Sequence, residues 1–146
     1  MTIRTWRRRA LALLASAGLL TGVALTAGAA PASALPNFTF SPVFMADGDV
    51  RIDVKNNGSH AGYAYWWQDP YLDYPGDTLV ANDSLADGWG IRAHLSTGRV
   101  ASTAGHNSPY EDWASGNLGE GNRYTMWVCA VKGDTAICSS RYEVTA

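Results

Sequence analysis

The sequence predicts an all-β protein, an antiparallel β-sandwich of about seven or eight strands that follows an N-terminal export leader. Three observations predict this fold. After the leader, the chain of 146 residues contains no long helical periodicity and no internal repeat. Short apolar or alternating runs recur instead, separated by Gly, Asn, Asp and Pro, which is typical of sandwiches and barrels. Tight-turn signals and one cysteine pair also fit neighbouring antiparallel strands.

The first 34 residues predict a cleaved signal peptide. Arginines at positions 4, 7, 8 and 9 precede an uncharged run rich in Ala, Leu and Gly over residues 10–30, and the Ala-Ser-Ala stretch at 32–34 matches a signal-peptidase site. A membrane anchor is the alternative, because the apolar run is about long enough to span a bilayer. We expect cleavage after Ala34, which divides the chain into a signal peptide, 1–34, and a single secreted domain, 35–146.

The leader also indicates a route and a destination. Its Arg-Arg-Arg-Ala-Leu stretch at residues 7–11 partly resembles the twin-arginine export signal, so the general secretory (Sec) route and the twin-arginine (Tat) route both stay open. Its Arg-headed, Ala-rich composition is similar to that of leaders from high-GC Gram-positive bacteria. We expect a bacterial protein that is extracellular or cell-wall associated, with no membrane partner once the leader is cleaved.

Eight runs predict the strands of the domain. In chain order they are Phe38–Phe44, Val50–Lys55, Gly62–Gln68, Thr78–Ala81, Trp89–Leu95, Arg99–Thr103, Tyr124–Val131 and Ala136–Val144. They are apolar or alternate apolar with polar residues, and turn-forming residues bound them. Asn57-Gly58 predicts a hairpin between the second and third runs, because both residues tolerate the positive φ of a tight primed turn. Thr97-Gly98 is a weaker signal of the same kind between the fifth and sixth runs.

The last hairpin can be placed by counting outward from a two-residue turn at 133–134. Cys129 and Cys138 are equally distant from this turn and therefore lie directly opposite each other. Because Lys132 and Thr135 form a hydrogen-bonded pair next to the turn, the cysteines fall on a non-hydrogen-bonded pair, where side chains approach most closely. Two cysteines in an exported chain predict one disulfide bond, with two unpaired buried thiols as the alternative.

The strand from Tyr124 to Val131 has two faces, because side chains alternate along a strand. We expect the even-numbered residues from 124 to 130 to face the core. The odd-numbered residues, with Trp127 beside the disulfide, line a face that is partly open. In the same register Arg141 and Glu143 would meet the core, so we expect a bulge near Ser139-Ser140 or an early strand end.

The C-terminal part resembles a known family of sandwiches. Residues Leu118 to Val131 contain Leu-Gly-Glu-Gly-Asn-Arg-Tyr and then Trp-Val-Cys-Ala-Val. This pattern resembles the E-to-F corner and F strand of fibronectin type III-like domains, which read Leu-x-Pro-Gly-x-x-Tyr before an alternating apolar strand. The resemblance implies an immunoglobulin-like sandwich in which the Tyr124 hydroxyl group hydrogen-bonds to the upstream backbone. It implies an architecture and no particular function.

The charge of the domain excludes one class of partner. Residues 35–146 contain seven basic and thirteen acidic residues, a net charge of −6 with His neutral. Phosphate binding needs a stripe of Lys and Arg that this chain lacks, so we expect no nucleic-acid partner.

Acidic residues gather in one part of the domain. Residues 45–87 contain eight Asp against Arg51 and Lys55, whereas residues 88–146 contain five basic and five acidic residues. None of these Asp residues has the D-x-D-x-D-G-x5-E spacing of a calcium loop. We expect them to form turns and to keep the domain soluble, and calcium binding stays an open question.

Aromatic residues are abundant after the leader, with five Trp, seven Tyr and three Phe. Alternation along Gly62–Gln68 places three of them on one face: Tyr63, Tyr65 and Trp67. We expect this face to pack in the core, and a surface that stacks on sugar rings or on a protein partner is the alternative. Other aromatic side chains are expected to be accessible and to bind a ligand, since Tyr and Trp combine contact area with a polar group. These candidate ligand-binding residues are Trp66, Tyr71, Tyr74, Tyr110 and Trp113.

These features predict a secreted, non-catalytic binding module that recognises an extracellular polymer, such as cell wall or another polysaccharide, or a protein. An exported inhibitor of a secreted protease or glycosidase is the first alternative, with the loop His106–Gly121 entering the active site of the target. A small secreted hydrolase is the second, and it would need Glu111 or Asp112 to meet another carboxylate. Because no G-x-S-x-G or H-E-x-x-H pattern is present, we expect no catalytic residues, no metal and no cofactor.

Overall fold

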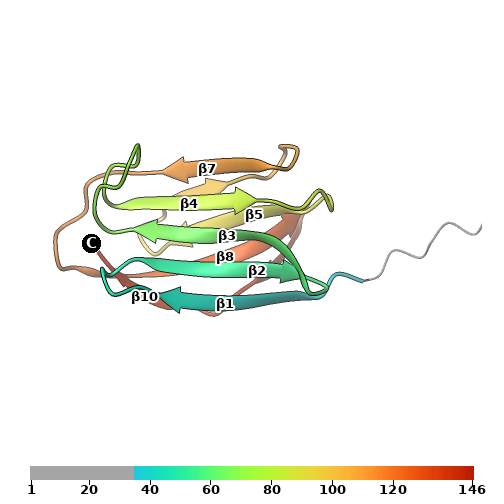
Figure 1. Cartoon of the computed structure of the whole chain (residues 1–146), viewed down its shortest axis with the longest axis horizontal. Helices are drawn as coiled ribbons and strands as arrows, with labels where there is room; N and C mark the ends of the chain where they lie inside the picture. The colour runs from blue at the N-terminus through green and yellow to red at the C-terminus, as the bar shows by residue number, and fades with distance from the viewer. Residues whose placement is uncertain (1–34) are drawn as a thin grey trace, which may run out of the picture. The chain divides into compact units, whose positions relative to one another are not determined.

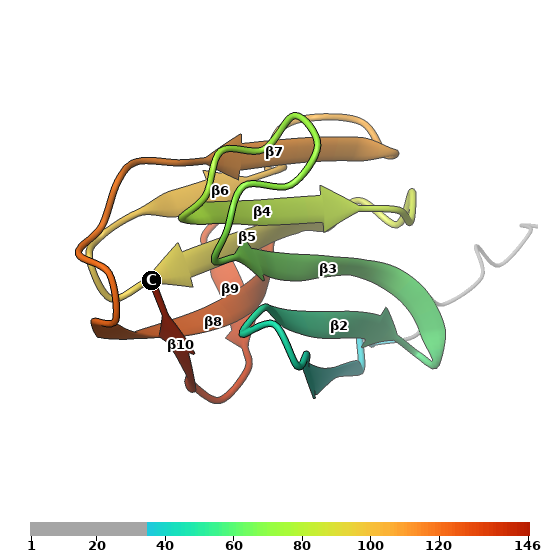
Figure 2. The same cartoon turned by 60° about the vertical axis from the view of Figure 1, so that its left-hand side comes forward.

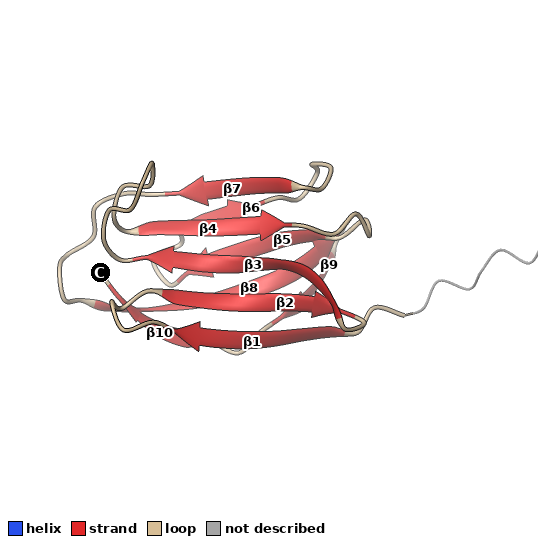
Figure 3. Ribbon diagram, in the orientation of Figure 1, coloured by secondary structure: helices blue, strands red, loops and turns tan. Residues whose placement is uncertain are grey.

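The computed structural model of the chain describes residues 35–146, so the predicted signal peptide and its cleavage site lie outside the described residues. Residues 35–146 form ten strands and no helix (Figure 3). The strands are β1 (Phe38–Phe44), β2 (Val50–Asn56), β3 (Ser59–Trp67), β4 (Thr78–Asp83), β5 (Gly90–Leu95), β6 (Val100–Ser102), β7 (Tyr110–Ala114), β8 (Arg123–Lys132), β9 (Thr135–Cys138) and β10 (Tyr142–Thr145). This part of the chain contains no helix with the length and apolar character needed to span a membrane.

Two antiparallel sheets lie face to face (Figures 1 and 2). The first sheet has the strand order β1-β2-β3-β4-β7. The second has the order β10-β8-β5-β6, and β9 also pairs with β8. The predicted all-β sandwich is therefore confirmed. The immunoglobulin-like relationship stays a prediction, and its key residue, Tyr124, lies half-buried against the core.

The ten strands exceed the seven or eight predicted because the last run is split in two and because β7 was expected to be loop. β7 lies within His106–Gly121, and its sequence Tyr-Glu-Asp-Trp-Ala lacks an apolar alternation. It is a strand because β4 pairs with all five of its residues. The Asp112 carboxylate also accepts a hydrogen bond from the Ser102 N–H group of β6 (2.7 Å), which joins the two sheets at this edge.

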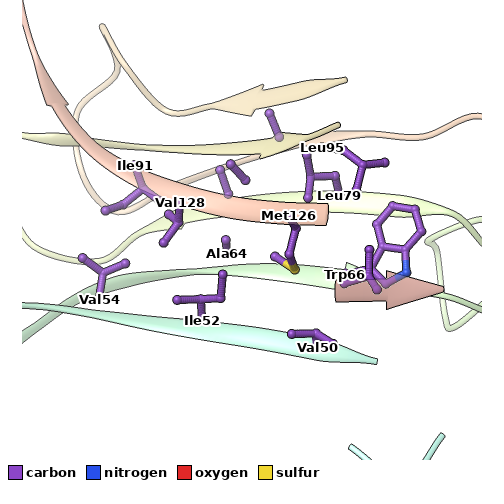
Figure 4. Packing of buried hydrophobic residues seen from close by; sticks show 14 of the residues in the cluster. Val50, Ile52, Val54, Ala64, Trp66, Leu79, Ile91, Leu95, Met126 and Val128 are labelled. Carbon is purple, nitrogen blue, oxygen red and sulfur yellow. The ribbon is translucent and has the colours of Figure 1, made fainter. Parts of the chain in front are cut away.

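The inner faces of the two sheets form one apolar core (Figure 4). Its fully buried members include Ile52, Val54, Ala64, Trp66, Leu79, Ile91, Leu95, Met126 and Val128. Trp66 is 0% exposed, and its indole N–H group donates a hydrogen bond to the Thr145 carbonyl group (2.8 Å). The prediction that Trp66 is accessible is wrong: this side chain is the largest fully buried one and connects β3 to β10.

The irregular pairing of β2 with β3 explains why Trp66 is buried. Asn57 and Gly58 form the predicted tight turn, with φ values of 50° and 82°. The register of the two strands then shifts between Val54 and Lys55, so that Ala61 of β3 is an extra residue, a β-bulge. Because side chains alternate along a strand, one extra residue exchanges the two faces of the strand beyond it.

The bulge decides which aromatic residues enter the core. An uninterrupted hairpin would place Tyr63 and Tyr65 opposite apolar residues of β2, on the core side. In the structure Ala64 and Trp66 take these places. Tyr63, Tyr65 and Trp67 therefore lie on the outer face of the first sheet, and the expectation that they pack in the core is wrong.

The C-terminal hairpin has the predicted register. Cys129 lies opposite Cys138, and the two form a disulfide bond with their Cα atoms 4.0 Å apart. The Ser139 N–H group donates a hydrogen bond to the Val128 carbonyl group (2.9 Å). Since this adjacent pair is hydrogen-bonded, the cysteines occupy the close, non-hydrogen-bonded position that we expected.

The expected bulge near Ser139-Ser140 is present. The connection between β9 and β10 has one residue more than the stretch of β8 opposite it. The extra residue turns Val144 into the core, where it is 2% exposed. Glu143 points outward instead and forms an ion pair with Arg123 (3.2 Å). The bulge thus keeps a charged side chain out of the core.

The outer face of the second sheet is cationic. Trp127 lies there half-buried, as predicted, and its ring stacks on His94 with the ring centres 4.9 Å apart. The Arg141 guanidinium group lies 4.1 Å from the centre of the Trp127 ring. Burial lowers the pKa of His94, and the nearby charges of Arg92 and Arg141 lower it further. This face therefore differs in charge from the outer face of the first sheet, described below.

Replacing both cysteines with alanine (Cys129→Ala with Cys138→Ala) is expected to lower the free energy of unfolding by about 2 to 3 kcal/mol, because the bond closes a short loop in the unfolded chain. Urea unfolding of the double variant and of the wild type, without reductant, measures this difference. Identical unfolding midpoints would contradict the prediction. Native mass of the wild type, two hydrogen atoms lighter than the reduced chain, is the control for bond formation.

Candidate functional site

The outer face of the first sheet carries a cluster of aromatic side chains that we call the aromatic face. β3 contributes Tyr63, Tyr65 and Trp67, the loop between β3 and β4 contributes Tyr71 and Tyr74, and β7 contributes Trp113. In register across the sheet, Tyr65 is opposite Val80, and Val80 is opposite Trp113. Residues that pair directly lie on the same side of a sheet, so three strands and one loop supply this surface.

Trp67 lies at the centre of a stack of rings. Its ring centre is 4.1 Å from that of Tyr65 and 4.6 Å from that of Tyr71, with interplanar angles of 27° and 10°. Tyr74 is 5.9 Å from Trp67 and meets Trp113 edge to face at 6.2 Å. Each such pair adds about 0.5–1.5 kcal/mol beyond burial. The stack is thus held in place, and its accessible rings are Tyr71 and Trp113, which are 52% and 49% exposed.

The loop between β3 and β4 presents part of this surface beside β7 (Figure 2). Tyr71 and Tyr74 each donate a backbone hydrogen bond to the other's carbonyl group, both 3.0 Å long. The Asp77 N–H group closes the base of the loop by donating to the Gln68 carbonyl group (3.0 Å). Leu72 at the tip is 83% exposed. The loop therefore has its own hydrogen-bonded structure and presents Tyr71 and Leu72 to solvent.

Glu111 of β7 fixes the loop to the sheet. Its carboxylate accepts hydrogen bonds from the Tyr63 hydroxyl group (3.0 Å), the Asn82 amide group (3.1 Å) and the Tyr74 hydroxyl group. The last bond, together with burial, raises the pKa of Tyr74 to about 12. Burial raises the pKa of Tyr63, and Glu111 adds to this effect. Both tyrosines therefore stay neutral hydrogen-bond donors, and Glu111 is fully engaged in holding the aromatic face together.

Glu111 and Asp112 do not form a carboxylate pair. They are neighbours on β7 and point to opposite faces, Glu111 to the aromatic face and Asp112 toward β6. Glu120 lies in the exposed segment after β7. Glu111, Asp112 and Glu120 therefore do not form the pair of carboxylates that a small hydrolase would need.

A cleft beside the stack collects carboxylates. We call it the acidic cleft, a hollow of about 300 Å³ whose walls include Tyr65, Trp67, Tyr71, Asp47, Asp49 and Asp69. Asp49 is 5% exposed and accepts hydrogen bonds from the Gln68 N–H group (2.9 Å) and the Tyr65 hydroxyl group (3.1 Å). Burial raises the pKa of Asp49, and Asp47 and Asp69 add to the shift, although the two hydrogen bonds act against it.

The structure brings together three of the five predicted binding residues: Tyr71, Tyr74 and Trp113. Trp66 lies in the core. Tyr110 does not join them, because it lies on the other face of β7 and its ring stacks on His106, 3.9 Å between ring centres. Sequence analysis did not indicate the acidic cleft or the stacking of Tyr65 and Trp67 with Tyr71 beside it. A glycine at position 62, next to the extra residue, is the signal that could have indicated the bulge.

A larger hollow of about 560 Å³ lies at the other end of β4. Its walls carry both signs of charge, with Asp83 opposed by Arg92 and Lys132. The Ser108 hydroxyl group donates a hydrogen bond to the Asp83 carboxylate, and the Leu85 carbonyl group also lies within reach of it (3.2 Å). His106 is occupied by its stacking on Tyr110. Ser108 is therefore already hydrogen-bonded to a carboxylate. Because the wall mixes acidic and basic side chains, it does not indicate one chemical class of ligand.

Metal ligands are not gathered in the described part of the chain. Residues 35–146 contain no group of three or more His, Cys, Asp or Glu side chains arranged to hold a metal ion.

Comparison of the chain with protein-family models, with curated proteins and with solved structures finds no match.

Proposed function

We propose that residues 35–146 form a secreted, non-catalytic binding module, with an immunoglobulin-like architecture, that recognises an extracellular polysaccharide through the aromatic face. The export leader predicted over residues 1–34 supports the extracellular location. The observation that carries the proposal is a pre-ordered stack of rings with two accessible members, Tyr71 and Trp113, which are 52% and 49% exposed. Large exposed rings on one surface commonly mark an interaction site.

A sugar polymer fits this surface for two reasons. A pyranose ring has an apolar C–H face that packs on a flat aromatic ring, and Tyr and Trp supply such rings at small entropic cost. Its hydroxyl rim needs hydrogen-bonding groups close to those rings, and the exposed carboxylates of Asp47 and Asp69 in the acidic cleft lie beside Tyr71. Apolar contact area with a few polar groups at its rim is the usual composition of a ligand site.

The test is sedimentation with insoluble polymers. The secreted domain is mixed with cell-wall, chitin and cellulose preparations, and the bound fraction is measured after pelleting. We expect retention on at least one polymer, and Tyr71→Ala and Trp113→Ala are each expected to weaken it about tenfold, the effect of removing a central contact residue. Both residues are exposed, so their variants are expected to unfold within about 1 kcal/mol of the wild type.

Phe44→Ala is the matched control. Phe44 is 62% exposed but lies on β1, away from the stack, where its ring meets Tyr142. This variant removes an equally accessible ring and is expected to be retained like the wild type. Retention of Tyr71→Ala and Trp113→Ala at the wild-type level, or no retention of the wild type on any polymer, would refute the proposed function.

A further inference from the structure

The second sheet concentrates positive charge in a domain that is negative as a whole. Residues 35–146 carry a net charge of −6 with His neutral, but the strands β5, β6, β8, β9 and β10 contain one carboxylate, Glu143. The same strands contain three residues with a permanent positive charge: Arg92, Arg123 and Lys132. Arg141, directly before β10, adds a fourth. Charge of one sign on one part of a surface favours a partner of the opposite sign.

Two of these arginines have no acidic partner. Glu143 forms its ion pair with Arg123 (3.2 Å). Within the described part of the chain, neither Arg92 nor Arg141 forms an ion pair with a carboxylate. The Arg92 Nε–H group donates a hydrogen bond to the Ser102 hydroxyl group (3.3 Å), which holds the side chain and leaves its two terminal amino groups available. Both guanidinium groups can therefore bind an anion.

A stack of rings lies with these arginines on the outer face of the sheet. His94 of β5 and Trp127 of β8 are paired in register, and their ring centres are 4.9 Å apart. The Arg141 guanidinium group lies 4.1 Å from the centre of the Trp127 ring. β8 lies between β5 and β10, so His94 and Arg141 reach Trp127 from opposite sides (Figure 2). A guanidinium group stacked on a ring keeps the N–H groups at its edges, so the stack positions Arg141 without using its donors.

Both arginines act on the charge of His94. Burial lowers the pKa of His94, and Arg92 and Arg141 lower it further. The strands on either side of His94, β6 and β8, contain no carboxylate. Asp112 of β7 is the acid that faces β6, and it is hydrogen-bonded to the Ser102 N–H group. An anion held by the two guanidinium groups would therefore favour the protonated form of His94.

A carboxylated polysaccharide fits this face better than a phosphate polymer. Binding to a phosphate polymer depends on neutralising many closely spaced charges, and two unpaired arginines in a domain of net charge −6 can neutralise few of them. A planar carboxylate instead matches a single guanidinium group through two parallel hydrogen bonds. A sugar polymer with a carboxylate on each ring presents such groups one at a time, separated by uncharged hydroxyl groups.

We propose that the outer face of the second sheet is a second binding surface, on which Arg92 and Arg141 bind the carboxylates of a polysaccharide that contains uronic acids. This uronate site and the aromatic face lie on the outer faces of opposite sheets. The proposal therefore goes beyond the proposed function and does not depend on it. Because a bound carboxylate favours protonated His94, the affinity increases as the pH falls through the pKa of His94, while the uronates stay ionised.

The test compares two soluble oligomers that differ only at the carboxyl group. Oligomers of galacturonic acid and the methyl esters of the same oligomers are titrated calorimetrically into the secreted protein at low salt. We expect the acid to bind at least about tenfold more tightly, with an advantage that falls as salt screens the charges. Equal affinity for acid and ester would overturn the inference. Tighter binding of a linear phosphate oligomer with the same number of charges would overturn the assignment to carboxylates.

Variants assign the binding to the second sheet. Arg92→Gln and Arg141→Gln are each expected to weaken binding of the acid about threefold to tenfold, with binding of the ester unchanged. Lys55→Gln is the matched control, because it removes the same charge from an exposed side chain of β2, in the first sheet. An equal effect of all three substitutions would indicate only general electrostatic attraction and would overturn the uronate site. Urea unfolding of the variants checks that each is folded.

The titration of His94 is an independent measurement. The imidazole signals of the protein are followed by NMR across the pH range in which histidine titrates, with and without a saturating amount of the acid oligomer. We expect the pKa of His94 to rise on binding, because a bound carboxylate offsets the charges of Arg92 and Arg141. An unchanged pKa would show that the oligomer binds elsewhere and would overturn the inference.

The two proposals fail separately. Trp113→Ala is expected to lose retention on an insoluble polymer but to bind the acid oligomer like the wild type. Loss of acid-oligomer binding in this variant would overturn a separate uronate site. Absence of acid-oligomer binding in the wild type, together with its retention on an insoluble polymer, would overturn the uronate site and leave the proposed function standing.

Discussion

Trp66→Ala is expected to lower the free energy of unfolding by about 3 to 5 kcal/mol, the usual cost of truncating a buried tryptophan. The side chain is 0% exposed, so its removal leaves a cavity between the sheets. The substitution also removes the indole N–H group, which in the wild type donates a hydrogen bond to the Thr145 carbonyl group (2.8 Å). Since small domains are stable by only about 5 to 15 kcal/mol, this variant loses a large part of its stability.

Urea unfolding of Trp66→Ala measures the loss, and Trp113→Ala is the control of the same residue type. Trp113 is 49% exposed, so its truncation is expected to cost about 1 kcal/mol or less. Polymer binding is expected to show the opposite order of effects. Folded Trp66→Ala should be retained on the polymer like the wild type, whereas Trp113→Ala should be retained less. If Trp66→Ala is too unstable to purify, Trp66→Phe keeps most of the packing and is expected to lose about 1 to 3 kcal/mol. Equal stability of Trp66→Ala and Trp113→Ala would contradict the burial of Trp66.

Gly62→Ala is expected to lower the free energy of unfolding by about 3 kcal/mol or more. A Cβ atom at this position would lie 2.0 Å from the Asn82 carbonyl oxygen of β4 and 3.1 Å from Ile91 of β5. The first of these atoms belongs to the backbone of a central strand, so it cannot move without disturbing the pairing of β3 with β4. The φ angle of Gly62, 156°, is also one that residues with a side chain rarely adopt.

Gly98→Ala separates the two causes. Gly98 has a φ of 90° in the turn between β5 and β6, and a Cβ atom there would meet nothing within 4 Å. Its substitution therefore reports the cost of a positive φ alone, about 1 kcal/mol. The same urea titration is used for both variants. A loss in Gly62→Ala no larger than that in Gly98→Ala would show that the close approach of β3 and β4 is not important for stability.

Features that depend on residues close together in the sequence were predicted correctly. The Asn57-Gly58 turn formed as predicted because its positive φ angles are set by the dipeptide itself. The cysteine pair followed from the turn at 133–134 by counting, because pairing near a tight turn leaves one register. The bulge near Ser139-Ser140 followed from the cost of placing charged residues in the core.

The candidate site depends on contacts that are distant in sequence, and its prediction was therefore partial. β7 is a strand because β4 lies beside it, although its own residues do not signal one. Glu111 was considered as a possible acid of a hydrolase, but the tyrosines that occupy its carboxylate come from β3 and from the following loop. No local pattern indicates such a contact, since the partners are 48 and 37 residues apart.

The order of residues along the chain was enough to predict the all-β class, the approximate strand positions and the cysteine pair. Which aromatic residues face the solvent depends instead on how the strands pair. One extra residue, Ala61, exchanges the faces of β3, so Trp66 enters the core and Trp67 joins the outer stack. Because side chains alternate with a period of two residues, a single bulge reverses the direction of every later side chain of the strand. The bulge in turn is accommodated because Gly62 lets β4 approach closely, which is a contact between strands.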